Sequence, residues 1–231
     1  MVRSIGWFWH KRPTALEGAA PSARGGRAAA TIAARLTFDF DTQSGFIARG
    51  MTTPTPLSRG EFGALASRRI LAFLKSRAIA TTWCVPGFTI ESWPKECAAV
   101  VEHGHEIANH SWAHIPSATM TREEEEADLV RANEAIVRLT GRKPRGYRSA
   151  SWDLSASTID LLIAHGFVYD SSLMGGDYLP YRARRGDVAV LGKPYAFGAE
   201  TSLIEMPISG TERNRFWMAA KIGFQKQPKN Q

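Results

Sequence analysis

The sequence predicts an α/β fold in which the strands of a parallel sheet alternate with helices. Segments of strand length and apolar character alternate with segments of helical periodicity along the chain. The first strand segment, 34–40, contains Ala34, Leu36, Phe38 and Phe40, and we expect a strand covered by helices on both faces. Polar side chains gather where predicted strands end, and parallel α/β folds form their sites at that edge. The alternation implies βαβ units and a parallel sheet, either open or closed into a barrel.

Length and composition narrow the classes of protein. A chain of 231 residues with 44% hydrophobic content suits one domain with an ordinary core. The net charge is +7, but no zinc-finger, basic-zipper or RNA-binding motif accompanies it, so we expect no nucleic-acid partner. Two cysteines make no disulfide framework. No run reaches the length of a membrane span or of a signal-peptide core, so we expect a cytoplasmic protein without a membrane partner.

The first half of the chain carries three predicted strands and two helices. Ser58 and Glu61 form a capping-box pattern that predicts the start of the first helix after a loop over 42–58. Ser92 is the predicted cap of the second helix, and Pro94 lies in its first turn. The expected strands are 34–40, 79–85 and 106–108, and the expected helices are 58–76 and 92–103.

The second half continues the alternation. Thr121 begins a capping box, and the glutamates at 123–126 favour the positive end of a helix dipole, so we interpret them as a solvated helix start. Gly141 is the expected end of that helix. Further strands are expected at 146–149, 167–170 and 202–206, with a helix at 155–165.

Two histidines and two aspartates suggest a metal site. His110 and His114 follow a short apolar run, and one helical turn between them would point both imidazoles the same way. Neutral imidazole is the commonest metal-ligand side chain, and a carboxylate from Asp41 at the end of the first strand would complete the set. Two imidazoles and one carboxylate around an open position are typical of a hydrolytic zinc-type site.

Other residues at the same edge could serve the chemistry. Asp39 lies two residues before Asp41, so a regular strand would point both side chains the same way, and Asp39 could accept a proton from water. Arg148 could pair with Asp39 and fix its orientation. A backbone N–H in the loop after Arg148 could stabilise an oxyanion, and Trp152 offers an apolar wall. The segment 170–172 is either a site loop or a polar turn.

Four motifs in this order resemble the polysaccharide deacetylase family, also called the NodB-homology or carbohydrate esterase 4 family, in its peptidoglycan-deacetylase-like and cyclic-imide-hydrolase-like branch. They are Phe38-Asp39-Phe40-Asp41, His110-Ser111-Trp112-Ala113-His114, Tyr147-Arg148-Ser149-Ala150-Ser151-Trp152 and Tyr169-Asp170-Ser171-Ser172-Leu173. The resemblance implies a distorted (β/α) barrel and metal-dependent hydrolysis of a non-peptide C–N amide bond.

The resemblance also implies roles for individual residues. Asp39 resembles the catalytic base, and Arg148 resembles the arginine that orients this base. Ser151 resembles the residue whose backbone N–H helps to stabilise the oxyanion. The residues that resemble the ligands of one divalent metal ion, zinc in our expectation, are Asp41, His110 and His114.

The sequence departs from the family pattern at three places. Ala150 stands where the family usually has proline, and no histidine follows His165 to serve as the general acid. After Pro207 the sequence no longer resembles the family. We therefore expect a barrel that is incomplete at its C-terminus, with a flexible basic arm at 1–33, a catalytic domain at 34–208 and a divergent tail at 209–231.

The function expected from the resemblance is N-deacetylation of an amino-sugar polymer or oligomer. Two alternatives stay open: hydrolysis of a cyclic imide or amide, and a truncated non-catalytic homologue that binds only metal or carbohydrate. The partner would be a carbohydrate or a small amide. An incomplete barrel exposes an unpaired strand edge, which can pair with a second copy, so a homo-oligomer is a further hypothesis.

Overall fold

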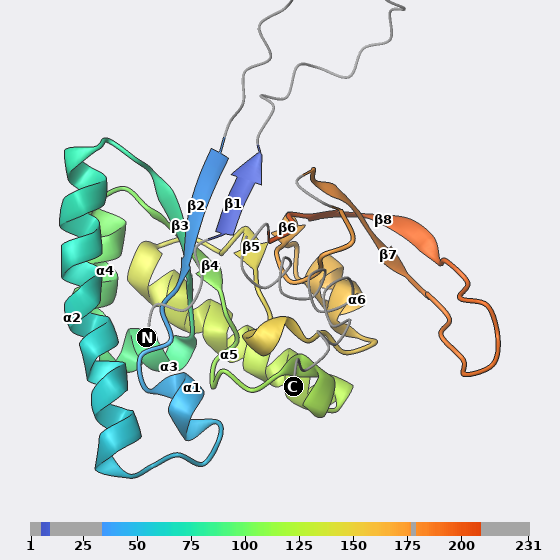
Figure 1. Ribbon diagram of the computed structural model, residues 1–231, viewed down its shortest axis with the longest axis horizontal. Coiled ribbons are helices and arrows are strands. Elements are labelled where there is room, and N and C mark those ends of the chain that lie inside the picture. The colour runs from blue at the N-terminus through green and yellow to red at the C-terminus, as the bar shows by residue number, and fades with distance from the viewer. Residues whose placement is uncertain (1–5, 10–33, 177–178, 209–231) are drawn as a thin grey trace, which may run out of the picture.

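The computed structural model describes residues 6–9, 34–176 and 179–208, and these form one sheet flanked by helices (Figure 1). The strands of the sheet are β1 (Gly6–Trp9), β2 (Ala34–Asp39), β3 (Thr81–Val85), β4 (Glu106–Asn109), β5 (Gly146–Tyr147), β6 (Tyr169–Asp170), β7 (Tyr181–Arg185) and β8 (Ala199–Glu205). The helices are α1 (Ser44–Ile47), α2 (Pro54–Ser76), α3 (Gly87–Ser92), α4 (Pro94–Glu102), α5 (Arg122–Thr140) and α6 (Thr158–Ala164).

The strand order is β1-β2-β3-β4-β5-β6-β8-β7. Neighbours from β2 through β6 to β8 pair in parallel, whereas β1 and β7 pair antiparallel at the two edges. Within the described ranges no pairing joins β1 to β7, so the ring of strands is not closed. This confirms the expected α/β architecture, a distorted and incomplete barrel.

Two apolar clusters hold the helices against the sheet. The larger one surrounds Trp83, which is fully buried, and joins β2, β3 and β4 to α2, α4 and α5. The smaller one joins β5, β7 and β8 to α5 and α6, and it includes Tyr147, Leu162 and Leu203. The strands are thereby fixed relative to one another, and their ends can present side chains in a defined arrangement.

The starts of three helices differ from the sequence-based prediction. Helix α2 begins at Pro54 after Thr53, because Pro54 and Pro56 suit a first turn that lacks N–H partners; Ser58 lies inside the helix and donates to the Thr55 carbonyl. Ser92 is the last residue of α3, a helix that was not predicted, and Pro94 opens α4. Helix α6 begins at 158 instead of 155.

Helix α5 follows its prediction closely. Thr121 Oγ1 accepts from the Glu124 N–H, and the Glu124 carboxylate accepts from the Thr121 N–H, which is a complete capping box. Gly141 ends the helix at φ 73°. Four strands are shorter than predicted, because β2 ends at Asp39, β3 begins at Thr81, β5 spans only Gly146–Tyr147, and β6 spans only Tyr169–Asp170.

Three elements besides α3 were missed. Helix α1 lies in the predicted loop over 42–58, and β7 has an arginine-rich sequence that resembles no buried strand. Strand β1 pairs with β2 inside the segment that was expected to be a flexible arm. The rest of that arm and the expected tail at 209–231 lie outside the described residues. No described helix is long and apolar enough to span a membrane.

Candidate metal centre and active site

The predicted site residues meet at one edge of the sheet. Asp39 is the last residue of β2, His110 follows β4, and Arg148 follows β5. In the sheet, β4 is the neighbour of β5, and β3 alone separates β4 from β2. All of these strands run parallel, so their carboxyl ends share one edge. The structure therefore brings together residues that are up to 109 positions apart in the chain.

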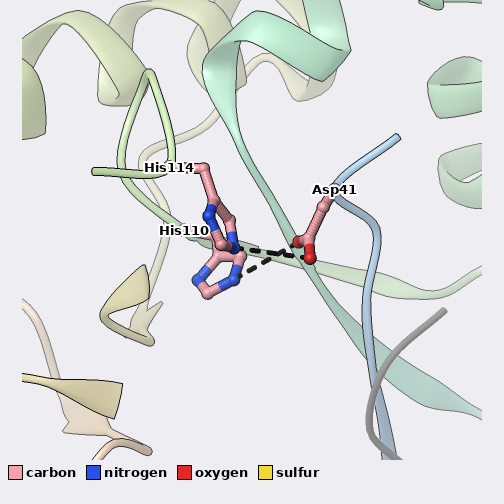
Figure 2. A group of neighbouring side chains, drawn as sticks. All are labelled: Asp41, His110 and His114. Atoms are coloured by element: carbon pink, nitrogen blue, oxygen red, sulfur yellow. Dashed lines mark ion pairs between the residues drawn. The ribbon is translucent and has the colours of Figure 1, made fainter. Parts of the chain in front are cut away.

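Asp41, His110 and His114 form a buried cluster of ligand-type side chains (Figure 2). Asp41 Oδ1 lies 3.4 Å from His110 Nε2, and Asp41 Oδ2 lies 3.3 Å from His114 Nε2. One donor atom from each residue lies within 4.8 Å of the others. A carboxylate and two imidazoles at this spacing could hold a divalent ion such as zinc.

The orientation of His110 supports this interpretation. Its Nδ1 donates to the Arg148 carbonyl at 2.6 Å, which leaves the Nε2 lone pair directed at Asp41. Asp41 Oδ1 is buried and accepts no hydrogen bond from the described residues. Two electron-rich atoms therefore face one another, and a cation, either a proton or a metal ion, is needed between them.

The charges of this cluster shift its titration. Burial raises the pKa of Asp41, but hydrogen bonds and charge from the two histidines outweigh this and hold the pKa far below its usual range. Burial lowers the pKa of His110, but the hydrogen bond that the protonated imidazole donates to Asp41 and the charges of Asp39 and Asp41 leave this pKa raised. The cluster thus favours a carboxylate and a bound positive charge.

The histidine loop is irregular and does not form the helical turn that was predicted. Ser111 and His114 both have a positive φ, at 63° and 59°. The loop is held instead by α5, where the Asp128 carboxylate accepts from the N–H groups of Trp112 at 2.7 Å and Ala113 at 3.2 Å. These long-range bonds, and not helical geometry, turn both imidazoles toward Asp41.

Helix α3 fixes the other side of the loop. The Gly87 N–H donates to the Ser111 carbonyl at 3.0 Å, and the Phe88 N–H donates to the Trp112 carbonyl at 2.9 Å. A Cβ atom at Gly87 would lie 2.4 Å from Cδ1 of Trp112, so only glycine lets the indole approach this closely. Arg131 of α5 stacks on the same indole, with Cζ 3.2 Å from the ring centroid.

Arg148 is fully buried and pairs with Asp39, as the sequence suggested. One terminal guanidinium nitrogen lies 2.5 Å from Asp39 Oδ1. The other donates to Thr37 Oγ1 and Ser171 Oγ, and Nε donates to the Ser171 carbonyl at 3.0 Å. Burial lowers the pKa of Arg148, but the adjacent Asp39 charge outweighs this and leaves the pKa above its usual value. This network fixes the Asp39 carboxylate in place.

Residues 170–172 were predicted to be either a site loop or a polar turn. In the structure their side chains contact Arg148 and the segment after it, as a site loop would. Ser171 contacts Arg148, and Ser172 Oγ accepts from the Ser149 N–H and donates to Asp170 Oδ1. Glu205, at the end of β8, accepts from the N–H groups of Ser172 and Leu173, both at 3.0 Å. The segment therefore supports both Arg148 and the loop that begins at Ser149.

Glu205 is a site-supporting residue that the sequence reasoning missed. It is fully buried beside Asp170 in the parallel register of β6 and β8. Burial raises the pKa of both carboxyl groups, and the charge of Asp170 raises the pKa of Glu205 further, so the pair favours a bound proton. A glutamate between Ile204 and Met206 in a strand expected to be buried was the available signal.

Ser151 and Trp152 lie in a short turn that directly follows Arg148. Both have left-handed backbone conformations, with φ 59° and φ 58°. Ser151 is exposed, Trp152 is half-buried, and the Trp152 N–H donates to the Ser149 carbonyl at 3.0 Å. The turn lies at the same sheet edge as Arg148, where a carbohydrate ring could reach it.

Comparison with known proteins agrees with this geometry. The sequence model of the polysaccharide deacetylase family matches residues 60–169. A peptidoglycan deacetylase of Helicobacter pylori is 36% identical over 182 residues, which cover 73% of this chain and 62% of that protein. A peptidoglycan deacetylase-like protein of Gibberella zeae is 34% identical over 148 residues, which cover 62% of this chain and 44% of that protein.

A solved structure shows the same relationship. A Mycobacterium smegmatis protein assigned to the polysaccharide deacetylases superposes with a TM-score of 0.63 at 30% identity, over 75% of this chain and 57% of that chain. The chain thus spans less than two thirds of the length of each of these three proteins. These matches show that the chain is similar in sequence and in fold to polysaccharide deacetylases.

Proposed function

We propose that this protein is a metal-dependent hydrolase that removes N-acetyl groups from amino sugars of a cell-wall polymer. The observation that carries the proposal is the buried cluster of Asp41, His110 and His114 beside an Asp39 that Arg148 holds in place. The curated relatives support the substrate class, because they are named peptidoglycan deacetylases and, at lower identity, a chitin deacetylase.

Asp41, His110 and His114 would hold one divalent ion, which we propose is zinc. The fit rests on the buried Asp41 oxygen without a hydrogen-bond partner and on the Nε2 atoms that face it. When bound, such an ion polarises the amide carbonyl and makes water more acidic. The Arg148 carbonyl engages Nδ1 of His110, so Nε2 is the nitrogen available to the metal.

Asp39 would act as the base. Its carboxylate takes a proton from the water that attacks the acetyl carbon, while Arg148 keeps the carboxylate oriented. A backbone N–H in the turn at Ser151 would donate to the oxyanion, and Trp152 would pack against the sugar ring. When the C–N bond breaks, the amine leaves with a proton. We propose that Asp39, which took the proton from water, returns it to the amine.

The test combines bound metal and acetate release. In the purified full chain we expect about one zinc per molecule, and loss of zinc in Asp41→Ala and His110→Ala. His103→Ala is the matched control, because His103 is exposed and bonds only the Ala99 carbonyl in the described structure. Asp39→Asn should keep the zinc and lose acetate release from N-acetylglucosamine oligomers.

Other results would change the proposal in defined ways. Zinc bound at one per chain without acetate release from any oligomer or from peptidoglycan would indicate a homologue that only binds. Opening of a succinimide ring without acetate release would assign the site to cyclic imides. A folded parent without bound metal would overturn the mechanism.

A further inference from the structure

Strands β7 and β8 form a hairpin whose loop, residues 186–198, exposes several apolar side chains. We call residues 188–197 of this loop the tip, and the two strands with their ends the stem. Figure 1 shows the loop, in orange, reaching well away from the helices and the rest of the sheet. Leu191 is completely exposed, and Phe197 is 75% exposed. Val188, Val190 and Tyr195 in the same loop are each about half-exposed. Contiguous apolar exposure of this kind marks a surface that meets a partner.

The base of the hairpin is held by a polar network. The Asp187 carboxylate accepts from the Arg184 guanidinium at 3.1 and 3.2 Å, from the Gly198 N–H at 2.6 Å and from the Tyr195 hydroxyl. Val188 and Ala196 pair across the hairpin through two backbone hydrogen bonds. These bonds fix the stem of the hairpin. No described residue outside the hairpin covers its apolar tip.

Close packing at Gly198 and a contact between Arg184 and Phe197 also fix the shape of the stem. A Cβ atom at Gly198 would lie 2.0 Å from the Arg185 carbonyl oxygen, so the two chains of the hairpin approach closely there. Arg184 also places its guanidinium over the Phe197 ring, 4.8 Å from the centroid. These contacts order the aromatic side of the loop without burying it.

The charges around the tip are mainly positive. Between residues 181 and 200 the sequence has Arg182, Arg184, Arg185 and Lys193 against Asp187 and Glu200, which leaves a net charge of +2. Lys193 lies in the tip itself and is exposed. The whole chain carries +7. The hairpin therefore combines a short apolar tip with a basic stem.

We propose that this hairpin docks on an anionic lipid surface, with Val190 and Leu191 entering the acyl boundary and Arg182 and Lys193, which no described carboxylate pairs with, meeting the headgroups. Burial of exposed Leu and Val side chains drives insertion, and the basic stem adds attraction to anionic lipid. The proposal concerns a surface away from the metal cluster and does not depend on the deacetylase assignment.

Two other occupants fit less well. A second copy of the chain has the same positive charge, and pairing of two β7 edges would bring arginine opposite arginine. A sugar polymer hydrogen-bonds extensively, whereas Leu191, Val190 and Val188 offer it no polar group. An anionic lipid surface matches both the exposed aliphatic side chains of the tip and the positive charge of the hairpin.

The first test is co-sedimentation of the full chain with vesicles. We expect binding to phosphatidylcholine vesicles that contain phosphatidylglycerol, weak binding to phosphatidylcholine alone, and loss of binding as salt is raised. The double variant Val190→Ser/Leu191→Ser should bind at least about tenfold more weakly than the parent. Phe62→Ser/Leu65→Ser is the matched control, since these exposed side chains lie on α2, and it should bind as the parent does.

A fluorescent label locates the contact. Cys84 and Cys97 are both buried, so a polarity-sensitive dye on Leu191→Cys reports from the tip, and one on Phe62→Cys reports from α2. We expect a blue shift with anionic vesicles only for the tip label. No vesicle binding at low salt, or equal binding by the tip variant, would overturn the proposal. A concentration-dependent dimer that the tip variant loses, without vesicle binding, would assign the tip to a second copy and also overturn it.

Discussion

The site edge of the sheet and the β7–β8 hairpin lie on the same sheet but use charged and apolar residues in opposite ways. At the site edge, the ionisable groups Arg148, Asp39 and Glu205 are almost fully buried; Arg148 pairs with Asp39, and Glu205 accepts from two backbone N–H groups. At the hairpin, the charged groups brace an exposed stem, and the apolar side chains remain in contact with water. Charge buried in a network is costly to disturb, whereas exposed charge and exposed apolar surface are available to a partner.

The largest expected difference concerns the two arginine–aspartate pairs. Arg148→Met should lower the free energy of unfolding by about 3–5 kcal/mol, because Asp39 would lose its buried partner. Arg185→Met, which breaks an exposed pair with Asp160, should cost less than about 1 kcal/mol. Urea unfolding followed by circular dichroism measures both. Similar losses for the two variants would contradict the distinction between buried and exposed charge.

The same comparison applies to two leucines on either side of the hairpin. Leu203→Ala should cost about 2–5 kcal/mol, because Leu203 is buried against α6 and β5. Leu191→Ala should change the free energy of unfolding by about 0.5 kcal/mol or less, since the side chain is completely exposed. The measurement is again urea unfolding. A large loss at Leu191 would mean that the tip packs on the body of the protein in solution.

A third prediction tests how tightly the metal cluster depends on its surroundings. Gly87→Ala places a methyl group against the Trp112 indole, so we expect a loss of about 1–3 kcal/mol and weaker zinc binding. Zinc titration by calorimetry, with the stability measured in parallel, checks this. Unchanged affinity in a folded variant would show that the histidine loop keeps its shape without the close contact with α3.

The fourth prediction is a pH dependence at Glu205. Its pKa is raised in the folded state by burial and by Asp170, so the unfolded chain releases this proton first, near pH 4.5. As pH rises above that value, the parent loses stability by up to about 1.4 kcal/mol per pH unit until the folded pKa is passed. Glu205→Gln keeps the acceptor for the N–H groups of Ser172 and Leu173 and does not titrate.

The variant should therefore gain stability relative to the parent as pH rises from 4.5 to 7. Unfolding curves across this range measure the difference. A difference that stays constant with pH would mean that Glu205 is ionised in the folded protein and that Asp170 and Glu205 do not share a proton.

Much of the architecture follows from local patterns in the sequence. The alternation of strands and helices, the capping box of α5 and its glycine end are local features, and the structure agrees with each. Asp39, Asp41, His110 and Arg148 could also be placed together, because residues after parallel strands share one edge. Boundaries were less certain: the proline-led start of α2 replaced the predicted cap at Ser58.

Other features depend on contacts between distant segments. Asp128 holds the histidine loop, Gly87 accommodates Trp112, and Glu205 supports the segment after β6 across 32 and 33 residues. No local period encodes such contacts, since each partner alone resembles an ordinary helix, turn or strand residue. Strand β7 was missed for the same reason, because its arginines are typical of a surface segment.

The sequence by itself therefore determined the fold class and the candidate ligands, because hydrophobic periodicity and the position of polar residues after strands are written in neighbouring residues. Only the tertiary structure decided how the histidines turn toward Asp41, which acid pair supports Arg148, and that an apolar hairpin tip is left uncovered. Exposure and long-range hydrogen bonding are properties of the packed chain as a whole, and neighbouring residues in the sequence do not specify them.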